Sequence, residues 1–571
     1  MAAPIDDSPR DDHDPAKDGS AAASHGSYRS GFAFGILSFL GVALVTLAST
    51  IATARIYGVR IIGQFALASA PVAALWVLST AKEQAALIKE ITRLPPRHPR
   101  VTQLFSAVFT FSSTLTVTMS VLGALVAWLI FRGPLHHPEL ITPMFVSIAG
   151  YAIVTNTGWN FDSVFSAFVA GRELFWVRLH EALSFLVIAS IVGLGWHSIW
   201  GLVIGTIAGS LTALVHRIFF VRRFVRLRLT KSEYRVGMRA LPDLLRFGLK
   251  ITPGGMAQGA SQQAGVWAIA AVAPVGLVGA YSRAELIPNR LQQVNVRIVE
   301  VLYPTLVGRR ARGDGEGFDR ALVDSIRYGM TGMLLVAAIC GGAARSFLAL
   351  FGPGFSRATP ALVLLLLFPA MASVTTTQTQ ALWAVDRPGL TSIIQLARLT
   401  LTIALTIVLT PRLGITGPAI ALLAGFLVVV IWNTAALRPY LHRTMLATWG
   451  PRERFALIAG YSAGFASAHL VEHAFPSALG LILALAAGAL AYVGALFAVG
   501  GINERDRHRL DEMLDRVRLR VDLRRASALP HCATGVSTLA VGRGRDDGSS
   551  LTSHVSAESS GFGVEAHFEE L

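Results

Sequence analysis

The stretch PVGLVGAYSRAELIPNRLQQVNVRIVEVLYPTL, residues 274–306, combines two properties that rarely occur together. It has the length and apolar content of a membrane span, yet it carries Arg283, Arg290 and Arg297 at intervals of seven residues. Seven residues make almost two helical turns, so the three guanidinium groups fall on one stripe. An arginine at the centre of a bilayer costs about 2.5 to 3.5 kcal/mol on insertion scales. The stripe therefore predicts a positively lined cavity that holds water or an anion.

The composition of the whole chain indicates a membrane protein. Of its 571 residues, 53% are hydrophobic and 15% are charged, with a mean hydropathy of +0.54. Long apolar runs recur along most of the length, so we predict an all-α polytopic membrane protein with about fourteen transmembrane helices. The spans are expected at 31–54, 61–81, 104–131, 144–170, 178–195, 198–220, 247–272, 275–305, 322–348, 356–385, 389–411, 415–437, 453–473 and 477–500.

Basic residues set the expected orientation. The chain has 50 Lys and Arg against 35 Asp and Glu, a formal net charge of +15. If the N-terminus is inside, most of the basic residues fall in cytoplasmic loops, as the positive-inside rule requires. We therefore expect a multi-pass protein of the cell (inner) membrane with both termini in the cytoplasm. The excess charge reflects this orientation, and we expect no nucleic-acid partner.

The spans and the charged segments divide the chain into six parts. We expect a disordered cytoplasmic arm at 1–30, an N-lobe of six spans at 31–220, a basic cytoplasmic linker at 221–246, a C-lobe of six spans at 247–437, two extra spans at 453–500, and a cytoplasmic amphipathic helix with a disordered tail at 501–571. The two cysteines, Cys340 and Cys532, support neither a disulfide nor a cysteine-based metal site. We predict no cofactor and no metal.

The two lobes repeat each other at one constant offset in residue number. The segment Gly63–Ala68 matches Gly279–Ala284, and with the same offset the glycines at 201 and 209 match those at 417 and 425. Each repeat holds an even number of spans, so both run in the same direction and form parallel repeats about an axis along the membrane normal. Transporters built in this way hold their substrate between the lobes. The two last spans have no counterpart and are an appendage.

Several short segments carry a family resemblance. They are Tyr57-Gly58, Gly63-Gln64-Phe65, the end of the eighth span at Tyr303-Pro304, and Leu350-Phe351-Gly352-Pro353-Gly354-Phe355. With them, roughly residues 30–440 resemble the polysaccharide-transporter branch of the multidrug/oligosaccharidyl-lipid/polysaccharide exporter superfamily, the O-antigen and lipid-linked oligosaccharide flippases. The resemblance implies a V-shaped pair of six-helix lobes around a central cavity. It also implies a saccharide on a polyprenyl diphosphate as substrate, moved from the inner to the outer leaflet.

The polar residues of the second lobe suit such a substrate. Arginine supplies a permanently charged fork for phosphate oxygens, and amides bind sugar hydroxyls. The candidate substrate-binding residues are Arg283, Arg290, Arg297, Gln258, Gln262, Gln293, Lys250 and Arg398. Lys250 stands at the cytoplasmic mouth, where it could meet an incoming diphosphate or simply anchor the helix.

The acidic residues leave several interpretations open. Glu285 and Glu300 could pair with the stripe and make it purely structural. Asp162, in the fourth span, could meet the stripe across the cavity, couple transport to a proton, or pair within its own lobe. The candidates for coupling or charge pairing are therefore Asp162, Glu285 and Glu300.

The chain shows no catalytic motif and no glycine-rich phosphate loop ending in Gly-Lys-Ser/Thr, which favours a transporter over an enzyme. Two alternatives remain. One is a multidrug/cation antiporter of the same superfamily, although the first span contains no acid and an arginine-lined cavity suits cations poorly. The other is a flippase for the peptidoglycan lipid precursor, which shares the diphosphate. Expected partners are the lipid-linked saccharide, membrane lipids, and glycosyltransferases or a polymerase of the same pathway.

Overall fold

The computed structural model describes residues 28–81, 83–92, 94–168, 170–226, 230–442, 445 and 450–501. Within these ranges every regular element is a helix, which confirms the predicted all-α class. The predicted arm up to residue 27 and the predicted amphipathic helix and tail beyond residue 501 lie outside the described residues.

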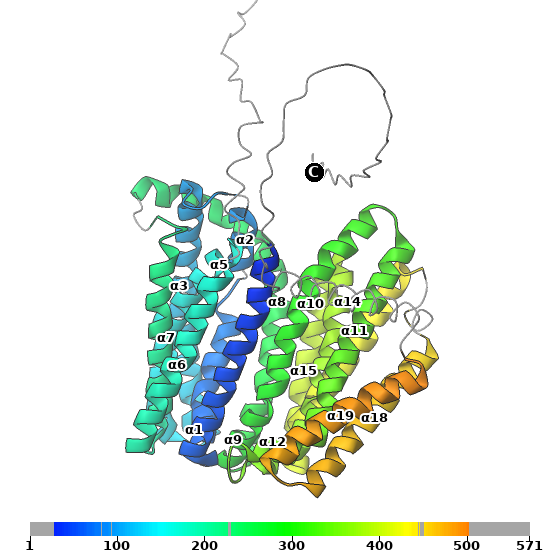
Figure 1. Cartoon of the computed structure of the whole chain (residues 1–571). Coiled ribbons are helices and arrows are strands. Elements are labelled where there is room, and N and C mark those ends of the chain that lie inside the picture. The colour runs from blue at the N-terminus through cyan, green and yellow to red at the C-terminus, as the bar shows by residue number, and fades with distance from the viewer. Residues whose placement is uncertain are drawn as a thin grey trace, which may run out of the picture. The chain divides into compact units, whose positions relative to one another are not determined.

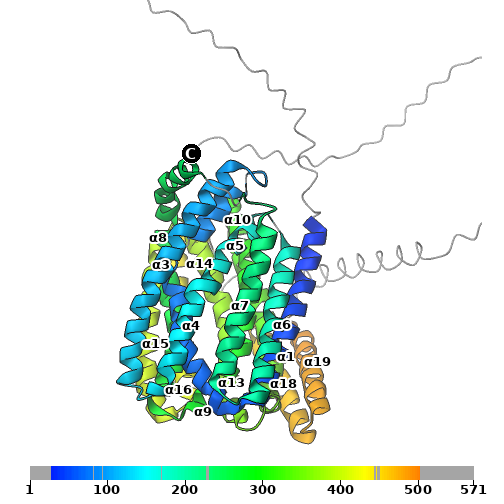
Figure 2. The ribbon, with the colours of Figure 1, turned by 90° about the vertical axis from the view of Figure 1, so that its left-hand side faces the viewer.

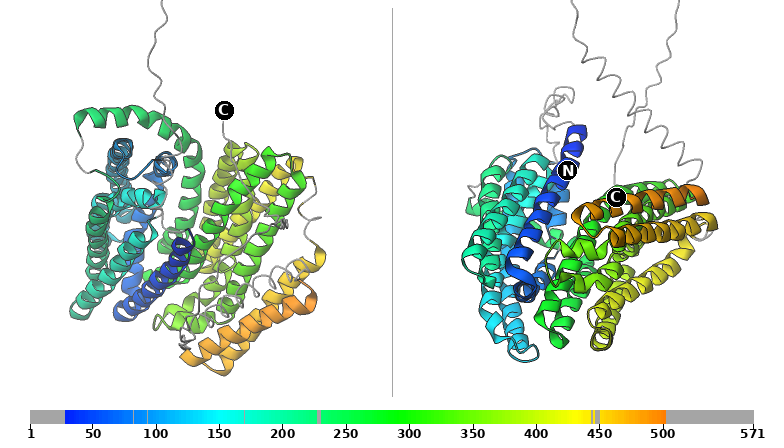
Figure 3. Two further views of the ribbon diagram at one scale, coloured as in Figure 1. Left: turned by 45° about the horizontal axis from the view of Figure 1, so that its top comes forward. Right: turned by 60° about the horizontal axis from the view of Figure 1, so that its bottom comes forward.

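The first group of helices, called here the N-terminal bundle, packs mainly on itself. It consists of α1 (Tyr28–Leu78), α2 (Glu83–Ile91), α3 (Pro99–Arg132), η2 (Pro138–Leu140), α4 (Ile141–Gly150), η3 (Tyr151–Thr155), α5 (Asn156–Ala167), α6 (Gly171–Gly195) and α7 (Ile199–Val221). In the two views of Figure 3 these helices, coloured blue to teal, gather on one side.

The second group is called here the C-terminal bundle. Its helices pack on one another in the same pattern as those of the N-terminal bundle: α15 packs on α8 and α16 as α6 packs on α1 and α7. It consists of α8 (Lys231–Val272), α9 (Val275–Ala284), α10 (Leu286–Ala311), α11 (Gly315–Gly342), α12 (Ala344–Ala349), η4 (Phe355–Ala358), α13 (Thr359–Leu365), α14 (Phe368–Ala384), α15 (Pro388–Leu413), α16 (Thr416–Leu437) and η5 (Arg438–Tyr440). Beyond it, α18 (Pro451–Ala474) and α19 (Ala478–Val499) lie side by side and pack on α11, in orange in Figure 1.

Helix α8 touches both bundles. Its first turns pack on α3, where a Cβ at Gly237 would overlap the carbonyl oxygen of Gln103, and Figure 2 shows this part of α8 beside α3. Its later turns pack on α15, where Gly254 lies against Ser392. Two prolines inside the helix, Pro242 and Pro253, each remove a backbone hydrogen bond and allow it to bend between these two contacts.

Each repeat contains a break between its first two predicted spans. Gly58, inside α1, has φ 73° and ψ 170°, so α1 is two helices joined by a residue in a conformation that only glycine adopts easily. The predicted first and second spans lie on either side of it. Pro274, the counterpart of Gly58 at the offset of the repeat, lies in the corresponding gap between α8 and α9.

The two bundles meet just after these breaks. A Cβ on Gly63 would overlap the carbonyl oxygen of Val275, and one on Gly279 would overlap that of Val59. The two glycines are counterparts in the repeat, and the two valines are counterparts at the same offset. The two contacts are therefore images of each other, like the halves of an isologous interface, which supports the predicted repeat.

Ten helices in the described part of the chain are long and apolar enough to cross a membrane. One of them, Gly41–Leu78, contains the break at Gly58 and so covers the first two predicted spans. The predicted seventh, eighth and thirteenth spans fall in α8, in α9 with α10, and in α18, which carry more polar and charged residues. The multi-pass architecture is confirmed, whereas the exact count of fourteen is not.

Candidate functional site

The arginine stripe lies on two consecutive helices. Arg283 is in the last turn of α9, Arg290 is in α10, and the boundary is at Glu285. Pro288 explains this boundary, because it has no N–H to donate to the carbonyl of Ala284. The chain keeps its direction, since Glu285 remains in the right-handed helical region and its carbonyl accepts from the N–H of Asn289 at 3.1 Å.

Arg283 and Glu285 do not pair with each other. No ion pair joins these two residues, both of which are described, and Glu285 instead has a side-chain hydrogen bond with Tyr281, one turn earlier on the helix. The Nε of Arg283 is buried and has no hydrogen-bond partner in the described part of the chain. The alternative in which Glu285 neutralises the stripe therefore receives no support at Arg283. The side chains of Arg297 and Glu300 lie outside the described residues.

Arg290 is on the accessible face of α10. Its side chain is exposed, as is that of Gln293 one turn further on. The opposite face is buried against α14, where Asn295 Nδ2 donates to the carbonyl oxygen of Pro369 at 2.8 Å. Arg178, on α6 of the N-terminal bundle, is close enough for its positive charge to act on that of Arg290.

Asp162 lies at the centre of a charge network inside the N-terminal bundle. Arg217 binds it with two bonds, from Nε to Oδ1 at 2.7 Å and from Nη2 to Oδ2 at 3.0 Å. Arg178 Nη2 donates to Oδ2 at 2.6 Å. Glu181 completes the group, at 3.5 Å from Arg178 and 3.8 Å from Arg217. Two arginines and two carboxylates leave the network electrically neutral.

Arg217 was not among the candidates from the sequence. It is 1% exposed, and it fits because Gly158 leaves room, since a Cβ there would lie 2.7 Å from Nη1. In the sequence it stands near the end of an apolar span, where an arginine normally extends its charge to the interface. The signal that could have found it is Asp162 itself, because a buried carboxylate needs a cation.

These contacts change the expected role of Asp162. The prediction that it would meet the stripe across the cavity is not supported, because both of its oxygens already bind arginines of α6 and α7. Pairing within its own bundle, the third of the interpretations above, is what the structure shows. The residue that approaches the stripe is Arg178, which binds Asp162 and also acts on Arg290.

Arg398 is buried inside the C-terminal bundle. It is 1% exposed, donates to Ser261 Oγ at 3.0 Å and to Gln395 Oε1 at 3.2 Å, and its Cζ lies 3.7 Å from the ring centroid of Phe426. No ion pair to a carboxylate is present in the described part of the chain. In this conformation Arg398 does not line an open space. Lys250, Gln258 and Gln262 lie on α8, with side chains outside the described residues.

The repeat relates Arg398 to the network of the other bundle. Gly209 packs on Glu181 and Phe185, and its counterpart Gly425 packs on Arg398 and Thr402. Each glycine thus meets residues four apart on the preceding long helix, so Arg398 occupies the place of Glu181. A positive charge has replaced a negative one.

The other network positions have lost their charges in the C-terminal bundle. Gln378 is the counterpart of Asp162 at the offset of the repeat, and it donates to Thr434 Oγ1 at 2.8 Å. Asn433 is the counterpart of Arg217, is 1% exposed, and its side-chain amide has no hydrogen-bond partner in the described part of the chain. The polar centre of the N-terminal bundle is therefore neutral, and that of the C-terminal bundle is positive.

At the end where the bundles meet, a cavity of about 490 Å³ adjoins Arg55. Arg55 Nε donates to the carbonyl oxygen of Leu350 at 2.8 Å, and Gly354 lies against Val59. The cavity is lined by Arg55, Ala349, Gly352, Pro353 and Ser356. The predicted central cavity along the arginine stripe stays a prediction.

Comparisons with known proteins agree with this architecture. A family model described as "Polysaccharide biosynthesis protein" matches residues 29–308. No curated protein sequence matches the chain. Among solved structures, one described as the lipid II flippase MurJ in an inward closed conformation has a TM-score of 0.61 and 12% identity, over 81% of this chain and 97% of that one. This likeness shows the fold.

A second solved structure is described as the inward-facing conformation of a multidrug resistance MATE family transporter of the MOP superfamily. It is 14% identical, over 71% of this chain and 94% of that one, with a TM-score of 0.49.

Proposed function

Since this chain belongs to the multidrug/oligosaccharidyl-lipid/polysaccharide exporter superfamily, we propose that it is a flippase for a saccharide linked to polyprenyl diphosphate. The substrate would move from the inner to the outer leaflet of the cell membrane for export of a surface polysaccharide or glycolipid. The family model for polysaccharide biosynthesis supports this assignment. No bond is made or broken, so the protein acts as a transporter and not as an enzyme.

The observation that carries the proposal is the exposed guanidinium of Arg290 on α10, on which the charge of Arg178 in the N-terminal bundle acts. Asp162 and Glu181 balance the charge of Arg178, whereas no ion pair balances Arg290 within the described residues, so Arg290 is the guanidinium that favours an anion. A diphosphate is such an anion, and it offers enough oxygens to accept from both guanidinium groups. The buried, unpartnered Nε of Arg283 provides a further donor about 10 Å along the helical path.

The contact between the bundles suggests which side of the protein is closed in this conformation. With the N-terminus inside, the breaks at Gly58 and Pro274 lie at the outer face, where Gly63, Gly279 and Arg55 hold the bundles together. This conformation is then closed to the outside. We propose that the diphosphate enters from the cytoplasm past Lys250, meets Arg297 and Arg290 in turn, and leaves past Arg283 when the outer contact opens. The polyprenyl tail remains in the lipid.

Two other substrates share parts of this chemistry. A peptidoglycan lipid precursor carries the same diphosphate, and the solved structure described as the lipid II flippase MurJ has the same fold. A cationic drug is the other alternative, and the positive surplus of the C-terminal bundle disfavours it. Glycosyltransferases or a polymerase of the same pathway are proposed partners, because they would supply and use the lipid-linked saccharide.

Reconstitution in vesicles tests the proposal. We expect Arg290→Ala to lower the rate of translocation of a polyprenyl-diphosphate saccharide by about tenfold or more, since one charge-assisted hydrogen bond is worth about 1.5 to 3 kcal/mol. Arg412→Ala removes another exposed arginine, at the end of α15, and should leave the rate unchanged. Equal rates for wild type and Arg290→Ala, with normal insertion, would overturn the mechanism. Faster transport of a lipid-linked muropeptide or of a cationic drug would identify an alternative substrate.

A further inference from the structure

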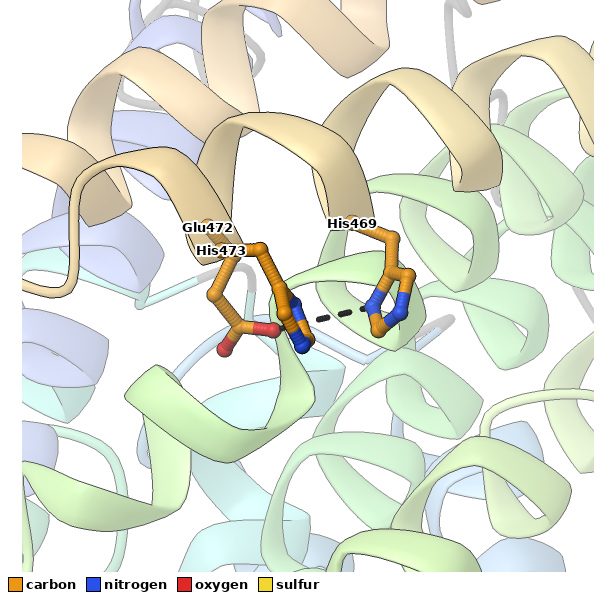
Figure 4. Close-up of side chains that lie close together, drawn as sticks. All are labelled: His469, Glu472 and His473. Carbon is orange, nitrogen blue, oxygen red and sulfur yellow. Dashed lines mark ion pairs between the residues drawn. The ribbon is translucent and has the colours of Figure 1, made fainter.

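Helix α18 carries a group of metal-ligating side chains that the transport mechanism does not use. His469, Glu472 and His473 follow the spacing H-x-x-E-H, which places all three on one face of the last two turns. One ligand atom from each residue lies within 4.8 Å of those of the other two, and Figure 4 shows the three side chains converging. The cysteine count gave no reason to expect a metal, and this group contains no cysteine.

Glu472 is the fixed member of the group. It is 5% exposed, and its Oε1 accepts a hydrogen bond from the backbone N–H of Ser346, at the start of α12. This bond orients the carboxylate so that Oε2 points toward His469, whose Nδ1 is 3.9 Å away. Outer bonds of this kind commonly hold metal ligands in place. No Lys or Arg forms an ion pair with Glu472 in the described ranges, so the buried carboxylate still needs a cation.

The histidines are the adjustable members. Both are exposed, and their rings lie with centroids 4.5 Å apart. Ligand atoms around a tetrahedral zinc ion are about 3.4 Å apart, given bonds of about 2.1 Å. Closing the present distances to that value requires only small rotations of two exposed rings, since the carboxylate is already placed.

We propose that His469, Glu472 and His473 bind one divalent transition-metal ion, preferentially Zn²⁺. Two imidazoles and a carboxylate are ligands that zinc favours, and three protein ligands leave a fourth position for water. The same spacing occurs in zinc peptidases, where the glutamate is the general base. In this chain Ser346 holds the glutamate, which we place among the ligands and not as a general base.

The bound ion would fix the carboxylate that binds Ser346, and so would support the contact of α18 with the segment that closes the bundles. Through Ser346, Glu472 touches the stretch that continues to Leu350 and Gly354, which contact Arg55 and Val59 of α1. By the predicted orientation this site faces the outside. It is separate from the arginine stripe, so the proposal does not depend on the identity of the transported substrate.

Direct titration tests the site. The full chain, purified in detergent without a histidine tag and stripped with EDTA, should bind Zn²⁺ with a stoichiometry of one in calorimetry. His469→Ala and His473→Ala should each weaken binding by at least tenfold. Glu472→Gln should do the same, although its amide oxygen can still accept from Ser346. His197→Ala, an exposed histidine elsewhere, should bind like wild type.

A second measurement needs no variant. Replacing zinc by Co²⁺ in the wild-type protein should give the visible absorption of a four-coordinate site, which Zn²⁺ then abolishes. The proposal is wrong if the wild type binds no zinc, if the two histidine variants bind as tightly as wild type, or if only Glu472→Gln does so. The last result would reduce the site to a pair of surface histidines.

Discussion

Arg217 donates two hydrogen bonds to the carboxylate of Asp162, at 2.7 and 3.0 Å, although the two residues are 55 positions apart on different helices. The side chain of Arg217 is 1% exposed and that of Asp162 is 16% exposed, so the pair is largely removed from water and lipid. A charge pair in such a place is neutral as a unit and costly when one partner is removed. Both oxygens of Asp162 are thereby occupied by arginines.

Removing one partner of this pair should destabilise the protein strongly. We expect Asp162→Asn to lower the free energy of unfolding by about 3 to 5 kcal/mol, because Arg217 keeps a buried charge that Glu181 only partly balances. Thermal unfolding in detergent measures the loss. The double variant Asp162→Asn with Arg217→Gln should recover part of it, since it removes both charges. Strictly additive losses in the double variant would contradict the pairing.

Replacing Arg398 should not destabilise the protein, in contrast to replacing Asp162. Arg398→Met removes a buried charge that has no carboxylate partner in the described residues, and keeps an apolar contact with Phe426. Replacing a buried charge by an apolar side chain of similar size is often neutral or stabilising, by about 1 to 4 kcal/mol. We therefore expect a melting temperature equal to or above that of wild type. Arg217→Met is the matched comparison, and it should melt lower because it leaves Asp162 without its main partner. A clear loss of stability in Arg398→Met would show that its bonds to Ser261 and Gln395 outweigh the cost of burial.

The contact between the bundles should be sensitive to a single methyl group. Gly63→Ala and Gly279→Ala each place a Cβ on top of a carbonyl oxygen of the other bundle, so α1 and α9 must separate. Such overpacking costs about 1 to 3 kcal/mol, and here it acts on the closed outer contact. In a background without the native cysteines, we expect faster labelling of Val59→Cys by a membrane-impermeant thiol reagent.

Gly276 provides the control for this experiment. A Cβ there would lie 3.7 Å from Val59 Cγ1, an ordinary contact, so Gly276→Ala should label like the parent. The repeat also predicts that Gly63→Ala and Gly279→Ala have similar effects. A large effect of only one of them would mean that the two halves of the contact are not equivalent.

Acid should loosen the start of α8. Thr230 caps this helix, and hydrogen bonds from its backbone N–H and its hydroxyl lower the pKa of Glu233 below the ordinary value of a glutamate. A lowered pKa means that the folded cap favours the ionised form. The contribution of this cap to the stability of α8 is therefore present above the ordinary pKa of the carboxyl group. It is lost as the pH falls through the lowered pKa. A spin label at Lys231→Cys should become more mobile on acidification, and Glu233→Gln should remove this pH dependence.

The sequence predicted those features that follow from the cost of charge in a membrane and from spacing. The arginines at 283 and 290 were selected because each is costly in a membrane, and their role in binding stays a prediction, whereas the repeat was recognised because glycines recur at one distance. Arg217 was missed because its position near the end of a span gave an acceptable alternative explanation. The break at Glu285 lies three residues before Pro288, because the effect of a proline falls on the carbonyl four residues earlier. The burial of Arg398 depends on which helices pack together, which its own span does not specify.

The paired contact of Gly63 and Gly279 also bears on how the chain arose. An interface in which residue i meets j and j meets i is the kind that two identical subunits form across a two-fold axis. Here one polypeptide contains both sides, as expected if a gene for a self-associating half was duplicated and fused. The two halves have since been free to differ in the charges they carry, as Glu181 and Arg398 do. At this crossing, in contrast, both halves carry glycine, because each backbone lies directly against the other.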